Sequence, residues 1–221
     1  MLAIIIPAYN EAERIGAVVT TLRHSYADAL VVVVDDCSTD ETGIRARAAG
    51  AVVLRHFINR GQGASLRTGT RWALAHGAEY LAHFDADGQF APTDIASAME
   101  VLQKGTADMV FGSRFLPGAL ANVPPAKQRV IMPLARAFNR LLGVRLSDPQ
   151  TGFRVMTHVA AERIHWQHDR MAHCSEIQQA VATAGLRVAE IPITVTYYEY
   201  GQRLSGGFKI ISDIVFGTFT K

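Results

Sequence analysis

Five short apolar runs in the first half of the chain constrain its fold more than any other feature. Each run is four or five residues long and shows little alternation between polar and apolar positions. Such runs are typical of strands buried on both faces, as in a parallel sheet covered by helices. The sequence therefore predicts an α/β fold with a mostly parallel central sheet and helices on both faces. The runs are residues 2–6, 30–34, 51–54, 80–84 and 108–112.

Polar residues after these runs predict where the helices begin. Asn10 is expected to cap a helix that carries Glu11 in its first turn. Ser38 and Glu41 have the spacing of a capping box and are expected to open the second helix. A further helix is expected over residues 61–77.

The composition suits one domain spanning residues 1–221. Hydrophobic residues make up 49% of the 221 positions, which is enough for a substantial core. The net charge of +2 gives no general case for a nucleic-acid partner. Cys37 and Cys174 cannot form a disulfide framework of the secreted kind, so a cytoplasmic protein is expected. No apolar run approaches the roughly 20 residues that a membrane-spanning helix needs.

Polar side chains also gather directly after three of the predicted strands. In an open parallel sheet, ligands bind beyond the carboxyl ends of the strands, where the strand order reverses. These side chains are therefore expected to share one binding site. They are Tyr9, Asn10 and Glu11 after the first strand, Asp35 and Asp36 after the second, and Asp85, Asp87 and Gln89 after the fourth.

Asp85, Asp87 and Gln89 place side-chain oxygens at every second position. Oxygen ligands with this spacing can converge on Mg²⁺ or Mn²⁺, which takes its other ligands from substrate phosphates and water. A diphosphate leaving group needs such a cation to neutralise its growing charge. Alternatively, Asp85 caps a turn and the other two side chains are solvated. The carboxylates at the neighbouring strand ends favour the metal site.

Gly61 and Gly63 precede a predicted helix and resemble half of a dinucleotide-binding fingerprint. The third glycine is missing, and the motif follows the third strand instead of the first, so a dinucleotide-dependent oxidoreductase is rejected. Gly61 and Gly63 are instead expected to allow close approach of the backbone to a ligand at the helix start.

Residues 109–147 contain six basic residues and no acidic one, a pattern that favours binding of phosphate groups. Within this tract, a helix predicted over residues 127–142 has basic and apolar positions on one broad face. Such a helix suits peripheral contact with the cytoplasmic face of a membrane, or equally packing on its own sheet with the arginines in water. An apolar helix predicted over residues 208–219 could dock in a homo-oligomer. The six basic residues are Arg114, Lys127, Arg129, Arg136, Arg140 and Arg145.

Seven segments together resemble the family 2 glycosyltransferases of GT-A fold, most closely the dolichol- and polyprenyl-phosphate hexose transferases. The resemblance covers residues 3 to about 215. It implies a nucleotide-sugar-binding half over residues 1–115 and an acceptor half with amphipathic helices over residues 116–221. It also implies metal-dependent, inverting transfer of a hexose from a nucleotide sugar to a polyprenyl or dolichyl phosphate. In chain order the segments read IIIPAYNEAERI, VVVVDDCSTDET, NRGQGASLRTG, HFDADGQF, MVFGSRF, SDPQTGFRVM and EIPITVTYYEYGQRLSGG.

The resemblance assigns positions of this sequence to three groups. One group binds the nucleotide-sugar donor, a second holds Mg²⁺ or Mn²⁺, and a third holds the acceptor phosphate. Arg114 is implied to face the donor and acceptor phosphates. The donor group is Pro7, Tyr9, Asn10, Glu11, Asp35, Asp36, Gly63 and Asp85; the metal group is Asp85, Asp87 and Gln89; the acceptor group is Arg129, Arg154 and Arg203.

The chemistry of the acceptor decides whether a general base is needed. A sugar hydroxyl is a poor nucleophile near neutral pH, whereas a phosphate monoester is already anionic and needs only positioning beside cations. The basic tract favours a phosphate. For a glycan hydroxyl in polysaccharide synthesis, Glu176 or Asp148 could act as the base, although Glu176 equally fits a solvated helix position. The predicted catalytic residues are thus Asp87, Arg114 and Glu176, and a non-catalytic nucleotide-sugar-binding module remains a minor alternative.

Overall fold

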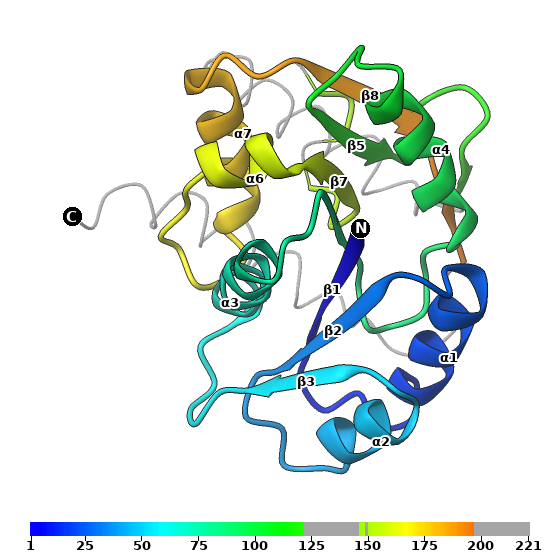
Figure 1. Cartoon of the computed structure of the whole chain (residues 1–221), viewed down its shortest axis with the longest axis vertical. Helices are drawn as coiled ribbons and strands as arrows, with labels where there is room; N and C mark the ends of the chain where they lie inside the picture. Colours follow the sequence, from blue (N-terminus) through cyan, green and yellow to red (C-terminus); the bar gives the residue numbers. More distant parts are fainter. Residues whose placement is uncertain (122–145, 149, 197–221) are drawn as a thin grey trace.

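A seven-stranded sheet forms the centre of the protein, which this computed structural model describes over residues 1–121, 146–148 and 150–196 (Figure 1). The strand order is β3-β2-β1-β4-β7-β5-β8. Neighbouring strands are parallel except for β7, which runs antiparallel to both β4 and β5. The prediction of a mostly parallel sheet is therefore confirmed. The strands are β1 (Leu2–Ala8), β2 (Leu30–Asp35), β3 (Val52–Arg55), β4 (Tyr80–His83), β5 (Met109–Ser113), β7 (Arg154–Thr157) and β8 (Val188–Pro192).

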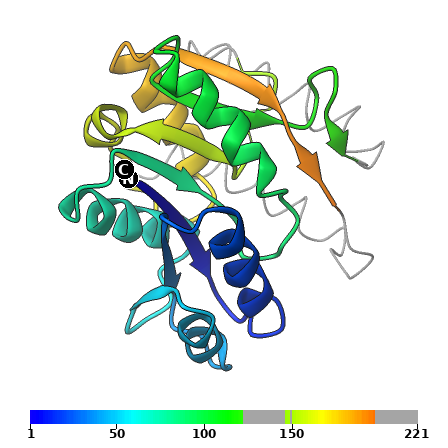
Figure 2. The ribbon, with the colours of Figure 1, turned by 45° about the vertical axis from the view of Figure 1, so that its right-hand side comes forward.

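Helices cover both faces of this sheet, as predicted (Figures 1 and 2). One hydrophobic core lies between the sheet and α1 (Ile15–Ser25), α2 (Thr42–Ala48) and α4 (Thr93–Gln103). A second core lies between the sheet and α3 (Gln62–Ala75), α6 (His158–Arg163) and α7 (His173–Thr183).

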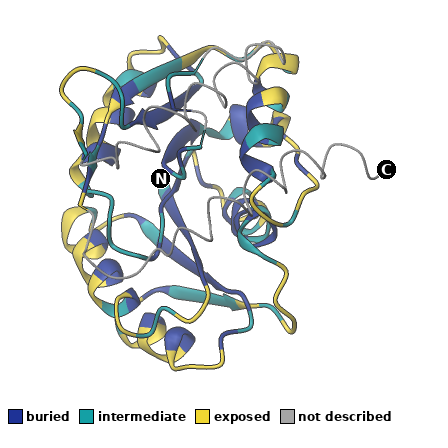
Figure 3. Ribbon diagram, turned by 180° about the vertical axis from the view of Figure 1, so that it is seen from behind, coloured by how far each residue is buried: buried dark blue, intermediate teal, exposed yellow. Residues whose placement is uncertain are grey.

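Successive residues of β1 contribute to opposite cores. Ile4 and Ile6 belong to the first core and Ile5 belongs to the second, and all three are fully buried. Figure 3 shows the same contrast across the molecule, with buried strands inside and exposed helix surfaces outside. Burial on both faces explains why the strand sequences lack a polar–apolar alternation.

The strand order reverses beside β1. The chain passes from β1 to β2 and then to β3 on one side, and β4 pairs with the other side of β1. The carboxyl ends of β1 and β4 consequently border a crevice of the kind that binds ligands in open α/β sheets. A separate two-stranded sheet pairs β6 (Leu120–Ala121) with β9 (Thr194–Val195).

The predicted starts of the first two helices are wrong. Helix α1 begins at Ile15, not after Asn10, and α2 begins at Thr42, not after Ser38. The reason is that polar side chains in the loops after β1 and β2 accept hydrogen bonds from backbone amides of the opposite loop. The hydroxyl of Ser38, for example, accepts a hydrogen bond from the backbone amide of Asn10 at 3.0 Å.

Several predictions concern residues outside the described ranges. These are the helices over residues 127–142 and 208–219, together with Arg129 and Arg203. Across the ranges that the structure does describe, none of the helices has the length and apolar character needed to cross a bilayer.

Candidate functional site

A cavity of about 530 Å³ opens at the carboxyl ends of β1, β2 and β4. Its size falls within the range of pockets that bind small organic ligands. The structure brings together six of the residues that were predicted to bind the donor or a metal ion. They are Pro7, Tyr9, Glu11, Asp36, Asp85 and Asp87.

Two interlocked loops hold the β1 side of this cavity in place. Asn10 has a positive φ of 55°, and its side-chain oxygen accepts a hydrogen bond from the amide of Thr39 at 2.9 Å. The amide of Glu11 donates to the hydroxyl of Thr42 at 2.8 Å. Asn10 does not line the cavity; it fixes the loop that presents Tyr9 and Glu11, so its predicted contact with the donor is replaced by a positioning role.

The adjacent carboxylates of Asp35 and Asp36 are used differently. Asp35 is fully buried and accepts a hydrogen bond from the amide of Ser38 at 2.8 Å. It was predicted to bind the donor, but it does not line the cavity. Asp36 borders the cavity and accepts hydrogen bonds from the amides of Arg60 at 3.0 Å and Gly61 at 2.6 Å. It therefore ties the loop before α3 to the end of β2.

Three carboxylates that line the cavity have raised pKa values. Burial and the charge of Asp87 raise the pKa of Asp85 to about 7, against the opposing charge of Arg154. Burial also raises the pKa of Asp87. It likewise raises the pKa of Glu11, and the charge of Asp87 adds to this shift although Arg14 opposes it. Raised pKa values indicate that the anionic forms lack sufficient compensating positive charge.

The raised pKa values of Asp85 and Asp87 show that a positive charge would stabilise their anionic forms. Both line the cavity and offer carboxylate oxygens, the ligands that a hard divalent cation prefers. In the described ranges no three His, Cys, Asp or Glu side chains form a ready metal-binding group. A cation here would thus take its remaining ligands from substrate phosphates and water, as Mg²⁺ commonly does. Gln89, the predicted third ligand, does not line the cavity; its backbone amide donates to Asp87 Oδ1 at 3.0 Å.

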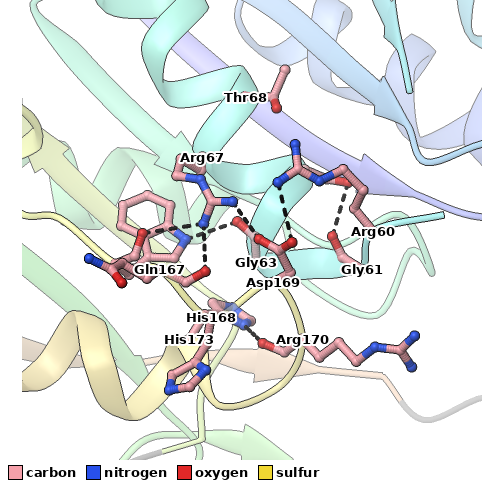
Figure 4. Close-up of polar contacts among 12 residues, drawn as sticks. Arg60, Gly61, Gly63, Arg67, Thr68, Gln167, His168, Asp169, Arg170 and His173 are labelled. Atoms are coloured by element: carbon pink, nitrogen blue, oxygen red, sulfur yellow. Dashed lines mark hydrogen bonds and ion pairs between the residues drawn. The ribbon is translucent and has the colours of Figure 1, made fainter. Parts of the chain in front are cut away.

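Gly63 approaches another part of the chain instead of a ligand. A Cβ atom at Gly63 would lie 2.8 Å from the Cβ of His173 and would also clash with the carbonyl oxygen of His168. The carbonyl of Gly63 accepts a hydrogen bond from the indole of Trp166 at 2.8 Å. The predicted close approach exists, but its partner is the segment 166–173 that lies against the start of α3 (Figure 4).

The segment 166–173 is pinned to α3 by several contacts. Arg67 donates to the carbonyls of Trp166 at 3.2 Å and Gln167 at 3.1 Å, and it forms an ion pair with Asp169. Arg60 also pairs with Asp169, at 3.3 Å (Figure 4). These contacts place Met171 in the wall of the cavity.

Arg154 lies in the interior, which corrects its predicted place at the acceptor phosphate. It is fully buried and donates from Nη2 to the carbonyl of Thr151 at 2.8 Å and to Cys174 Sγ at 3.1 Å. Burial alone would raise the pKa of the Cys174 thiol, but His173 and Arg154 lower it to about 6. Arg154 is therefore a buried cation that compensates the Cys174 sulfur and Asp85.

Arg114 and Glu176 do not line the cavity. Arg114 forms a two-pronged ion pair with the buried Asp148, with distances of 2.6 and 2.8 Å. This pairing leaves Asp148 unsuited to act as a base. Glu176 accepts hydrogen bonds from the amides of Gln167 at 2.9 Å and His168 at 2.7 Å, so it holds the segment 166–173. A structural role accounts for Glu176 better than the predicted catalytic one.

Several residues of the cavity wall were not predicted from the sequence. Gln62 is the most informative, because its amide nitrogen donates to Asp85 Oδ1 at 2.9 Å. Its place at the first position of a helix that starts beside the site was an available signal. Met171 gave no such signal, since it reaches the cavity only through the path of the segment 166–173. The residues that were not predicted are Ala8, Asn59, Gln62, Ser65, Ala86 and Met171; Gly61, which was expected to approach a ligand, lines the cavity.

Comparison with solved structures confirms the predicted GT-A fold. Glucosyl-3-phosphoglycerate synthase from Mycobacterium tuberculosis, solved with Mn²⁺ and UDP-glucose, superposes with a TM-score of 0.75. The superposition covers 97% of this chain and 76% of that chain, at 19% sequence identity.

Sequence comparison identifies closer relatives. The polyprenol monophosphomannose synthase of Mycolicibacterium smegmatis is 32% identical over 214 residues, which are 92% of this chain and 80% of that protein. The undecaprenyl-phosphate mannosyltransferase of Micrococcus luteus is 32% identical over 213 residues, which are 92% of this chain and 87% of that protein. Residues 3–164 match the family described as glycosyl transferase family 2. The predicted resemblance and the enzyme class are thereby confirmed: the chain belongs to glycosyl transferase family 2.

Proposed function

We propose that this glycosyltransferase moves a hexose from a nucleotide sugar to a polyprenyl or dolichyl phosphate, with inversion and with Mg²⁺ or Mn²⁺ bound. The observation that carries the proposal is the pair Asp85 and Asp87 in a cavity at the reversal of strand order. Two relatives at 32% identity bear names of enzymes that act with polyprenyl phosphates, which supports the choice of acceptor. The protein would work in peripheral contact with a membrane, where such acceptors reside.

The chain's own residues would bind and orient the donor. Pro7, Tyr9 and Asp36 would border the nucleoside, and Asp85 and Asp87 would hold the cation beside the diphosphate. That cation would supply positive charge to the leaving group. Gln62 would keep Asp85 oriented through its 2.9 Å hydrogen bond.

The acceptor would attack the anomeric carbon from the face opposite the leaving nucleoside diphosphate. A phosphate oxygen carries its own negative charge, so the step needs positioning and no general base. The engagement of Glu176 and Asp148 in structural contacts favours this acceptor over a glycan hydroxyl. The predicted phosphate-binding roles of Arg114, Arg129 and Arg203 belong to this proposal.

The substitution Asp87→Asn tests the metal site. Asparagine keeps the size of the side chain but removes its charge, so Mn²⁺-dependent binding of UDP or GDP should weaken at least about tenfold. Calorimetric titration with and without Mn²⁺ measures the effect. Asp28→Asn is the matched control, because Asp28 is an exposed aspartate before the amino end of β2, whereas the cavity lies at the carboxyl ends of the strands. Unchanged metal-dependent binding in Asp87→Asn would contradict the assignment.

A further inference from the structure

The cavity proposed to bind the donor, called the donor cavity below, is lined by carboxylates that would repel a phosphate ligand unless positive charge were supplied. Among the described residues, its wall contains four carboxylates and no basic side chain. A nucleoside diphosphate adds further negative charge, and one divalent cation offsets only part of the total. The carboxylates are Glu11, Asp36, Asp85 and Asp87.

Most arginines near the cavity are already paired. Arg14 bonds to Glu11 at 3.2 Å, and Arg60 and Arg67 both pair with Asp169. Arg170 differs from them: it is exposed, and its guanidinium makes no ion pair or hydrogen bond with any residue in the described ranges. Figure 4 shows its side chain extending away from the Asp169 contacts.

The structure fixes the backbone of Arg170 at the edge of the cavity. Its carbonyl accepts hydrogen bonds from the amide of His173 at 3.1 Å and from the ring of His173 at 2.7 Å. The preceding carbonyl, of Asp169, accepts from the amide of Ala64 at 3.1 Å. The next residue, Met171, lines the cavity, and so does Gly61. A Cβ atom at Gly61 would lie only 3.0 Å from Arg170 Cγ, so the stem of Arg170 packs beside the cavity wall.

We propose that Arg170 binds a substrate phosphate at the mouth of the donor cavity. A guanidinium can donate two parallel hydrogen bonds to the oxygens of one phosphate. Because the backbone of Arg170 is already held in place, less conformational entropy is lost when its side chain binds a ligand. The inference rests on the proposed function, which supplies two phosphates of the same chemistry: the donor diphosphate and the lipid phosphate. Arg170 would provide the positive side chain that the cavity wall lacks.

The test compares Arg170→Ala and Arg170→Lys with wild-type protein by calorimetry in the presence of Mn²⁺. UDP and GDP are the phosphate probes, and uridine and guanosine are the probes without phosphate. Arg170→Ala should weaken, by about tenfold or more, the binding of whichever nucleoside diphosphate the wild type binds more tightly. Binding of the nucleoside should be unchanged. Arg170→Lys should retain part of the lost affinity. Arg47→Ala is the control, because Arg47 is an exposed arginine in the last turn of α2 and should have no effect.

A second arm separates the two phosphates. The KM for a short-chain polyprenyl phosphate is measured for the same variants at saturating donor. A rise of about tenfold in Arg170→Ala, with nucleotide binding unchanged, assigns the residue to the lipid phosphate. No change in either arm, or an equal loss for nucleoside and nucleoside diphosphate, overturns the inference while leaving the proposed function intact. Wild-type protein that binds neither UDP nor GDP overturns the proposed function itself, and this inference with it.

Discussion

Gly63 lies where α3 meets the segment 166–173, and the contact requires a residue without a side chain. The carbonyl of His168 and the Cβ of His173 occupy the space that a Cβ would need. Because one obstacle is backbone, it cannot move aside by changing a rotamer. The same contact sets the path that carries Met171 to the cavity.

Gly63→Ala should therefore lower the free energy of unfolding by about 1–3 kcal/mol through overpacking. Gly16→Ala is the matched control, since a Cβ there meets no atom within 4 Å. Gly16 lies inside α1, where alanine should stabilise the protein by up to about 1 kcal/mol. Thermal or denaturant unfolding of both variants measures the difference. Equal stability of the two variants would show that the segment 166–173 adjusts freely to α3.

Asp35 and Asp36 show how one position along a strand decides a side chain's role. Residues that follow each other in extended chain point in opposite directions. Asp35 is directed into the packing against α2, where its Oδ2 lies 2.8 Å from the position of a Cβ on Gly43. Asp36 is directed to the loop before α3 and the cavity. The two carboxylates look equivalent in the sequence. Their roles differ because consecutive residues at the end of β2 direct their side chains to opposite sides.

The segment 166–173 is the element that most distinguishes the observed site from the predicted one. It links α6 to α7 and contributes no regular strand or helix before His173. Arg67, Trp166 and Asp169 anchor it to α3, and Glu176 anchors it to α7. An irregular segment fixed by so many side-chain contacts can serve as a rigid wall for a ligand site.

The entry into β5 is joined to the entry into β8 by an exposed ion pair. Asp108 accepts hydrogen bonds from the amide of Arg187 at 2.8 Å and from its guanidinium at 2.7 and 3.1 Å. Those hydrogen bonds lower the pKa of Asp108 from its ordinary value of 3.8. A carboxylate with a lowered pKa in the folded protein stabilises the fold above the pKa of the unfolded chain. That stabilisation is lost as the pH falls through the lower folded-state pKa.

Asp108→Asn should accordingly lower the midpoint of thermal unfolding at pH 7, and the gap to wild type should narrow as the pH falls below about 4. Melting curves at several pH values between neutral and strongly acidic measure the gap. The pair is exposed, so the gap should also shrink in high salt. A gap that stays constant with pH would instead point to a packing change caused by the substitution.

At the level of the whole molecule, the strands could be predicted because burial on both faces requires short, continuous apolar runs in the sequence. The runs at residues 2–6 and 30–34 became β1 and β2 almost unchanged. The location of the cavity was equally predictable, because parallel strands place their carboxyl ends on one edge. Tyr9, Glu11 and Asp87 could thus be assigned to one site without a structure.

The remaining errors share a physical origin in contacts between distant segments. Asn10 and Ser38 have the chemistry of helix caps, but they bond across two loops 28 residues apart. Arg154 has the chemistry of a phosphate-binding residue, yet β7 inserts between β4 and β5 and buries it. Local propensity contains no information about such insertions, so the positions of Arg154 and Met171 could come only from the tertiary structure.

Turnover by the purified protein is the decisive measurement for metal-dependent hexose transfer to a lipid phosphate. UDP-glucose and GDP-mannose are supplied separately with Mn²⁺ or Mg²⁺, each with and without a short-chain polyprenyl phosphate. We expect a glycosylated lipid phosphate from one of the donors, formed only when both the divalent cation and the lipid are present. Metal-dependent donor binding without any lipid product would contradict it, and would point to a glycan hydroxyl as the acceptor.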